Sequence, residues 1–320
     1  MLKRLGSLAA DKFLQRRYLH LLFLAVAVVF AFSNSLKGSF HLDDHYLIES
    51  NAGIRRVFPL HRHFIDPSTI SSLKRITQYR PMLPLTLSIN YFFTGKSPMG
   101  FRVGNILFHF IAAIVVYFLV LELFEFLRLR LSPTAAQNGA FVASLVFGVH
   151  PVSGFPINYL SARDLILMTL FMVSSLLIYV RMRNRGASLW GWALSLSLFA
   201  LALFSKTNGA VLPILIVLFE GVVKQKGIVS LKPWKASLPF WGVLAAQFAF
   251  KRFYVGFSDF TNAVPQSVSP FHYAAVQAKY HLFEYARNFI WPFYVRIMPE
   301  GEAFTSYFDI KVLLGALFIG

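Results

Sequence analysis

Long runs without a charged residue recur along the chain, and they constrain its fold more than any other feature. A helix needs about 20 apolar residues to cross the roughly 30 Å hydrocarbon core of a bilayer. The runs free of Asp, Glu, Lys and Arg are 18–36, 103–121, 131–162, 165–180, 186–205, 207–219 and 236–250. Two further apolar runs are 275–293, which carries a few charges, and the one that begins at Val312. The sequence therefore predicts an all-α polytopic membrane protein, a bundle of about eight or nine transmembrane helices.

Composition agrees with this fold class and excludes others. The chain is 56% hydrophobic and 14% charged, whereas a soluble domain has about 25% charged residues. Disorder requires low hydrophobicity, so it is excluded. The chain has no cysteine, which excludes a disulfide scaffold and a cysteine-ligated zinc site.

Basic clusters follow the second, fourth and sixth runs, at 128–130, 181–185 and 224–235. Short loops rich in Lys and Arg stay on the cytoplasmic side. The intervening loops, and the long segment 34–100, are therefore predicted to be external. Proline interrupts that segment, so it is not one helix. We predict short interfacial helices within it at 71–75 and 83–93.

Asp43 and Asp44 stand together just after the first predicted span, in a chain with only 14 acidic residues. A carboxylate at the membrane surface can act as a general base or stabilise a developing sugar cation. Both are candidate catalytic residues. A solvated acidic pair or a helix N-cap is the alternative.

Three basic residues are expected on the same external face: Arg80, Arg163 and Lys206. Arg and Lys are the natural ligands of phosphate, so this face can hold a phosphate-linked lipid. Snorkelling to the interface or headgroup binding is the alternative. We place the neighbouring Tyr79, Asp164 and Ser205 in supporting positions, together with His150 at the end of the third span.

Asn105 and His109 lie one turn apart inside the second span, on one face of the helix. Polar groups in a span are often functional, but a helix-to-helix hydrogen bond explains them equally well. The histidines at 41, 45, 61 and 63 lack supporting carboxylate spacing, so no metal is expected. The net charge of +17 is spread over loops between spans, so nucleic-acid binding is not expected.

A series of short motifs runs through the chain in order. They are His41-Leu42-Asp43-Asp44, Tyr79-Arg80-Pro81, Asn105 with His109, His150-Pro151-Val152, Ser161-Ala162-Arg163-Asp164-Leu165, Ser205-Lys206 and Trp291-Pro292-Phe293. The series resembles the membrane module of GT-C glycosyltransferases, specifically the transmembrane and tetratricopeptide-repeat protein O-mannosyltransferases and their bacterial relatives. The specificity lies in the series, because each motif is short.

The resemblance implies a polyprenyl-phosphate-linked sugar, mannose-like, as donor substrate, and an inverting transfer to a hydroxyl of a protein or glycan acceptor on the external or luminal face. It implies Asp43 or Asp44 as the base, with Arg163 and Lys206 at the donor phosphate, and membrane lipids as partners. No cofactor is expected besides the lipid-linked donor substrate, and a divalent metal is not expected. The expected location is a bacterial inner membrane with a periplasmic active face, or the endoplasmic reticulum membrane in a eukaryote.

Two departures from the family pattern leave alternatives open. Phe155 and Thr207 stand where the family has glutamates. They motivate a degenerate member without catalysis as an alternative to the enzyme. A transporter or flippase of a lipid-linked substrate is a second alternative, which the intramembrane Asn105 and His109 motivate. The chain ends inside a hydrophobic run and no repeat region follows, so residues 1–320 are expected to be a membrane module truncated at its C-terminus.

Overall fold

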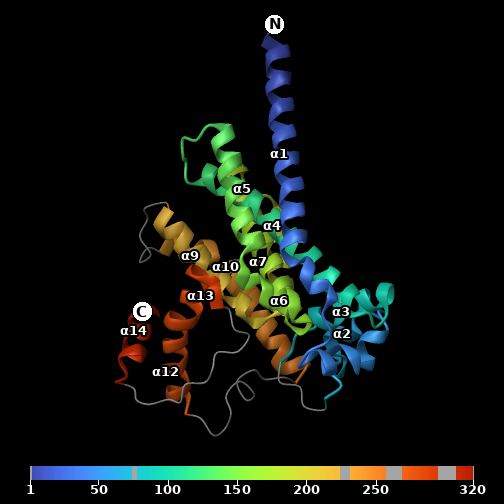
Figure 1. Ribbon diagram of the computed structural model, residues 1–320. Coiled ribbons are helices and arrows are strands. Elements are labelled where there is room, and N and C mark those ends of the chain that lie inside the picture. The colour runs from blue at the N-terminus through green and yellow to red at the C-terminus, as the bar shows by residue number, and fades with distance from the viewer. Residues whose placement is uncertain (1, 74–77, 224–230, 257–268, 295–307, 320) are drawn as a thin grey trace. The chain divides into compact units, whose positions relative to one another are not determined.

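The computed structural model describes residues 2–73, 78–223, 231–256, 269–294 and 308–319, and among these residues it contains helices and loops but no strand (Figure 1). The predicted all-α class is confirmed. The chain divides into two compact units. One comprises Met1–Val149 with Pro156–Phe257, and the other comprises His150–Phe155 with Ser258–Gly320.

The longer helices of the first unit, apart from Met82–Thr94, overlap the apolar runs of the sequence. They are α1 (Leu2–Phe32), α3 (Met82–Thr94), α4 (Pro98–Phe126), α5 (Pro133–Val149), α7 (Arg163–Arg185), α8 (Leu189–Ser205), α9 (Leu212–Val223) and α10 (Leu231–Ala249). Short helices α2 (Arg62–Ile65) and α6 (Gly154–Asn158) lie between them. Local chemistry sets the start of α4, because Pro98 occupies its first position and the Ser97 hydroxyl accepts a bond from Gly100 N.

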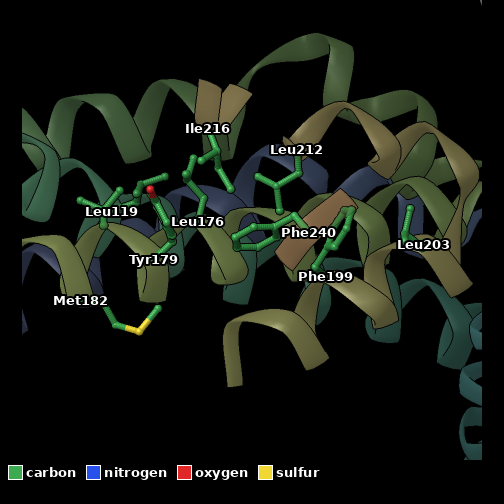
Figure 2. Close-up of a cluster of buried hydrophobic side chains, with 10 residues drawn as sticks. Leu119, Leu176, Tyr179, Met182, Phe199, Leu203, Leu212, Ile216 and Phe240 are labelled. Carbon is green, nitrogen blue, oxygen red and sulfur yellow. The ribbon is translucent and has the colours of Figure 1, made fainter. Parts of the chain in front are cut away.

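Helix α7 packs against both α4 and α8, while α4 also packs against α5, and α10 packs against α8 and α9. A cluster of buried side chains from these helices forms the core of this region (Figure 2). It includes Tyr179 and Leu176 of α7, Phe199 of α8, and Phe240 of α10. Lipid is as apolar as these side chains, so close packing rather than water exclusion holds such helices together in a membrane.

Three helical segments of the described residues are long and apolar enough to cross a membrane: Leu14–Lys37, Pro98–Phe126 and Leu160–Arg185. A fourth qualifies if the bent pair Pro133–Val149 and Pro151–Asn158 is one span. Helix α8 and the segment Thr207–Gly221 are apolar but shorter. The apolar helices fit an integral membrane protein, while the count of eight or nine spans stays a prediction.

The segment 34–100 folds as several short helical turns followed by α3. Helix α3 agrees with the predicted helix at 83–93. The helix predicted at 71–75 is wrong for Ser71–Leu73, which are not helical, and its remainder lies outside the described residues. Ser72 explains the difference, because its N–H and its hydroxyl both donate to Tyr46 O.

Basic residues gather at the C-terminal end of α7, around two buried carboxylates. Glu122 of α4 binds Arg181 and Arg185, and Glu220 of α9 binds Arg183 through both carboxylate oxygens. The two carboxylates therefore hold the cluster at 181–185 at one end of the helices, opposite the end where α7 begins at Arg163. Part of the cluster predicted at 224–235 lies outside the described residues.

The second unit contains α12 (Pro270–Tyr280), the π-helical turn η9 (His281–Ala286), α13 (Arg287–Ile290) and α14 (Ile310–Ile319). Helix α14 packs against α12 so closely that a Cβ on Gly315 would lie 2.1 Å from Ala278 O. In this unit the His150 ring stacks on Phe289, and its Nε2 lies 2.9 Å from Phe289 O.

Candidate functional site

The two adjacent aspartates have opposite environments. Asp44 is fully buried, and its Oδ1 accepts bonds from Ser161 N at 2.8 Å and from the Ser161 hydroxyl at 2.6 Å. Its Oδ2 accepts a bond from His41 N at 3.1 Å. Asp44 therefore ties the first loop to the segment that precedes α7. Its acceptor sites are occupied by protein donors, which suits a structural role.

Asp43 is exposed, and Tyr159 is the group beside it. The backbone N–H of Asp43 donates to the Tyr159 hydroxyl at 3.4 Å. Burial, and next the hydrogen bond to the Asp43 side chain, raise the pKa of Tyr159. The phenol therefore stays protonated and is a donor toward Asp43. Of the two aspartates, Asp43 is the one that a substrate can reach.

Asp164 is the centre of a group of basic side chains at the start of α7. The side chain is fully buried, and its Oδ2 lies 2.7 Å from Arg80 Nη1 and 3.1 Å from Lys206 Nζ. Arg80 and Lys206 are 16% and 24% exposed, so part of each cation reaches the surface. The structure thus brings together three of the predicted site residues through one shared carboxylate.

Arg163 precedes Asp164 but points into the protein, where it has no exposed surface. Its Nε donates to Asn105 Oδ1 at 2.6 Å, and its Nη2 donates to Asn90 Oδ1 and Phe101 O, both at 2.8 Å. Its Nη1 donates to Thr86 O at 3.1 Å. The guanidinium therefore clamps α3, α4 and α7 together. Its predicted role as a phosphate ligand is untested, and this geometry favours a positioning role instead.

The polar pair in α4 makes bonds within the protein. Asn105 donates to Pro156 O and Ile157 O, besides accepting from Arg163. His109 is buried, and its Nε2 lies 3.0 Å from Gly148 O. Both side chains therefore make hydrogen bonds between helical segments, which is the structural explanation given above as the alternative to a functional role.

Tyr79 and Ser205, two of the remaining supporting residues, directly precede the cations Arg80 and Lys206 in the chain. The Tyr79 hydroxyl donates to Phe64 O, and burial raises the pKa of this phenol. Ser205 is buried and donates to Leu201 O at 2.8 Å, a bond within α8. His150 belongs to the second unit, so the structure does not connect it with this group.

Two residues near the site are not among the candidates predicted from the sequence: Tyr159 and Lys251. Lys251 Nζ lies 3.4 Å from Thr207 Oγ1, next to Lys206. A search for charge on the external loops could have found Lys251, whereas nothing in the sequence singles out Tyr159.

Comparisons with known proteins identify relatives. A protein O-mannosyl-transferase of Caenorhabditis elegans is 31% identical over 171 residues, which are 52% of this chain and 23% of that protein. The human protein O-mannosyl-transferase TMTC4 is 33% identical over 202 residues, 58% of this chain and 27% of that protein. Human TMTC3 is 26% identical over 208 residues, 63% of this chain and 22% of that protein.

The match spans about a quarter of the length of these curated relatives. No family model matches the chain, and no solved structure matches it. The named relatives come from animals, so they lend no support to a bacterial inner membrane. Over about half of its length the chain is homologous to the protein O-mannosyl-transferases, which confirms the resemblance carried by its motifs.

Proposed function

We propose that the chain is an inverting GT-C glycosyltransferase that moves a mannose-like hexose from a polyprenyl-phosphate donor to an acceptor hydroxyl at the external or luminal face. The observation that carries the proposal is the position of residues 159–164. This segment binds the aspartate pair through Tyr159 and Ser161, and it binds two partly exposed cations through Asp164. The proposed base and the proposed phosphate-binding group are thus both tied to one short segment.

The proposed chemistry follows from the charges. Asp43 accepts the proton of the acceptor hydroxyl, whose oxygen then forms a bond to the anomeric carbon. The bond between that carbon and the phosphate oxygen breaks, and the electron pair leaves with polyprenyl phosphate. Arg80 and Lys206 stabilise the negative charge on the departing phosphate. Attack opposite the leaving group inverts the anomeric centre. A protein is the preferred acceptor, by analogy with the relatives, which are named protein O-mannosyl-transferases.

Asp164 holds the two cations in this proposal. A carboxylate shared by Arg80 and Lys206 restricts both side chains, so less conformational entropy is lost when the phosphate binds. Arg163 supports the arrangement from the interior, because its bonds to α3 and α4 fix the start of α7. The architecture that we propose for the whole module remains a GT-C bundle of about eight or nine spans.

The transporter alternative loses its motivating observation. That alternative relies on Asn105 and His109 as polar groups of a translocation path. Both side chains instead form hydrogen bonds with protein carbonyl groups. The degenerate-member alternative rests on Phe155 and Thr207, and a turnover measurement decides it.

The test uses the 320-residue chain, purified and reconstituted in nanodiscs, with a panel of polyprenyl-phosphate sugars and a Ser/Thr-rich protein acceptor. We expect release of polyprenyl phosphate together with glycosylation of the acceptor, with mannose as the preferred sugar. Donor binding without turnover would instead favour the degenerate member. Scrambling of a labelled donor lipid in proteoliposomes, without any bond cleavage, would favour the flippase.

A further inference from the structure

A pocket lies within the segment 34–100, and among the described residues none of the candidate site residues named above lines it. The pocket has a volume of about 570 Å³ and is open to the surface. Ligand pockets of this size usually have mainly apolar side chains with a few polar groups. Most of the residues that line this one are polar or charged, among them Ser50, Asn51, Arg62, Asp66, Ser68 and Ser72. Such a lining favours a ligand that is rich in hydrogen-bonding groups.

Asn51 fixes the shape of the pocket. The residue is buried, and its Nδ2 donates to Thr69 O at 3.0 Å and to Ile70 O at 3.1 Å. Its Oδ1 accepts a bond from Gly53 N at 2.8 Å. One amide therefore joins the two stretches of chain that form the walls. Because the walls are held in place before a ligand arrives, less conformational entropy is lost on binding.

Two opposite charges line the pocket without pairing with each other. Arg62 donates to Gly53 O through Nη2, and its Nε is buried without a hydrogen-bond partner. Asp66 accepts bonds from the N–H and the hydroxyl of Ser68, both through Oδ1. No ion pair in the described part of the chain includes either side chain. A guanidinium has five N–H donors and a carboxylate accepts at both oxygens, so each side chain can still bind a ligand.

The two charges restrict the charge of that ligand. Like charges placed together across an interface are unfavourable, so Asp66 disfavours an anionic ligand and Arg62 disfavours a cationic one. A neutral amide suits both, because its oxygen accepts from a guanidinium while its N–H groups donate to a carboxylate. Polypeptides carry such amides in their backbone and in Asn and Gln side chains. The pocket therefore fits a neutral, amide-bearing segment of polypeptide.

The pocket lies close to the proposed base along the chain. Ser50 follows Asp43 by seven residues, through the helical turn η2 (His45–Glu49). A helical rise of 1.5 Å per residue places Ser50 about 10 Å from Asp43. Ser72, on another wall, donates its N–H and its hydroxyl to Tyr46 O at 3.0 and 3.2 Å, which ties that wall to the same turn. An extended polypeptide advances about 3.3–3.6 Å per residue, so 10 Å corresponds to about three residues.

We propose that this pocket is a subsite for the acceptor polypeptide, and that it binds an Asn or Gln side chain about three residues from the hydroxyl that receives the sugar. Arg62 donates to the oxygen of that amide, and Asp66 accepts from its N–H group. The inference rests on the proposed function, in which a protein is the acceptor, and it names the acceptor side of the same reaction.

The test measures peptide binding without donor, so that it does not depend on turnover. Fluorescent Ala-rich peptides carry one Thr and, three residues from it, Gln, Ala, Glu or Lys. Each is titrated into the 320-residue chain in phosphatidylcholine nanodiscs, and the Kd is read from fluorescence anisotropy. The variants are Asp66→Asn and Arg62→Gln. Asn can still accept the bond from Ser68 N, so Asp66→Asn keeps the local turn. Arg55→Gln is the matched control, because Arg55 is exposed in the same segment and does not line the pocket.

We expect the parent to bind the Gln peptide about tenfold more tightly than the other three, the size of a hydrogen bond to a charged group. Asp66→Asn should lose this preference and bind the Glu peptide more tightly than the parent does, because only the cation remains. Arg62→Gln should likewise gain affinity for the Lys peptide, and Arg55→Gln should match the parent. A merely structural role would weaken all four peptides equally, and that result would overturn the proposal, as would equal binding of all four by the parent.

The distance to the base is tested in the same samples by a photoreactive residue that replaces the Thr. With the Gln three residues away, it should crosslink to the turn that contains Asp43; crosslinks only to other parts of the chain would refute the spacing. Displacement of the Gln peptide by an equimolar mannose oligosaccharide would show a glycan subsite and overturn the choice of ligand.

These outcomes are separate from those for the proposed function. A chain that binds the Gln peptide through Arg62 and Asp66 but transfers no sugar supports the pocket and contradicts the transferase. A chain that transfers sugar to all four peptides with the same KM does the reverse.

Discussion

Replacing Arg163 by Met distinguishes two roles of this residue: a structural clamp between helices and a ligand of the donor phosphate. The guanidinium is fully buried and makes four hydrogen bonds. Its loss leaves the side-chain oxygens of Asn105 and Asn90 without this donor. The carbonyls of Thr86 and Phe101 lie in α3 and α4, where helix bonds still serve them. A buried acceptor left unpaired costs about 1–3 kcal/mol; Asn105 is fully buried and Asn90 is half-buried, so together they cost about 2–5 kcal/mol.

One effect opposes this cost. Removing a buried charge also removes its desolvation penalty, and an apolar replacement of similar volume can be neutral or stabilising. We therefore expect a net loss of about 2–4 kcal/mol in the free energy of unfolding, within the range for broken buried networks. The substitution Arg163→Lys would not preserve the clamp, because a single ammonium cannot span the acceptors on two helices as a planar guanidinium does.

Unfolding of the purified chain by SDS in mild detergent, followed by circular dichroism, measures this change. Arg181→Met is the matched control on the same helix, since Arg181 is 51% exposed in its ion pair with Glu122, and such pairs contribute about 0–1 kcal/mol. An Arg163→Met variant as stable as this control, with impaired polyprenyl-phosphate binding, would refute the clamp and restore Arg163 as a phosphate ligand.

Two further predictions concern neighbours of this site. Gly104→Ala should destabilise the chain by about 1–3 kcal/mol, because its Cβ would lie 2.4 Å from Asn90 Oδ1; Gly242→Ala, with open space around it, is the neutral control in the same unfolding assay. Burial lowers the pKa of His63, so stability should fall as the pH drops below about 6.5, where the unfolded state takes up the proton. Unfolding midpoints at pH 7.5 and pH 5.5 test this, and a pH dependence unchanged in His63→Gln would contradict it.

The sequence predicted the helices well, because long apolar runs and proline positions are local signals. Pro98 and Pro133 begin α4 and α5, near the ends of the corresponding runs. The same runs could not decide how many helices cross the membrane, since several are shorter than a bilayer needs.

The site was harder to predict, because its residues differ by orientation rather than by type. Asp43 and Asp44 are adjacent and chemically identical, yet the turn after Leu42, at φ 49°, exposes one and buries the other. Arg163 and Asp164 are likewise adjacent, with different partners. Lys251 lies 44 residues from its contact at Thr207, so only tertiary packing could reveal it.

The central claim is that the exposed aspartate is the base. Sugar transfer from polyprenyl-phosphate mannose by Asp43→Asn, measured beside Asp44→Asn and the parent, tests it most directly. We expect Asp43→Asn to lose about 10²–10⁴ in rate, the usual share of a general base, with the unfolding stability of the parent. Asp44→Asn, in contrast, should lower the unfolding stability, because the Asp44 carboxylate accepts hydrogen bonds from Ser161 and His41. Parental transfer by Asp43→Asn would contradict the account.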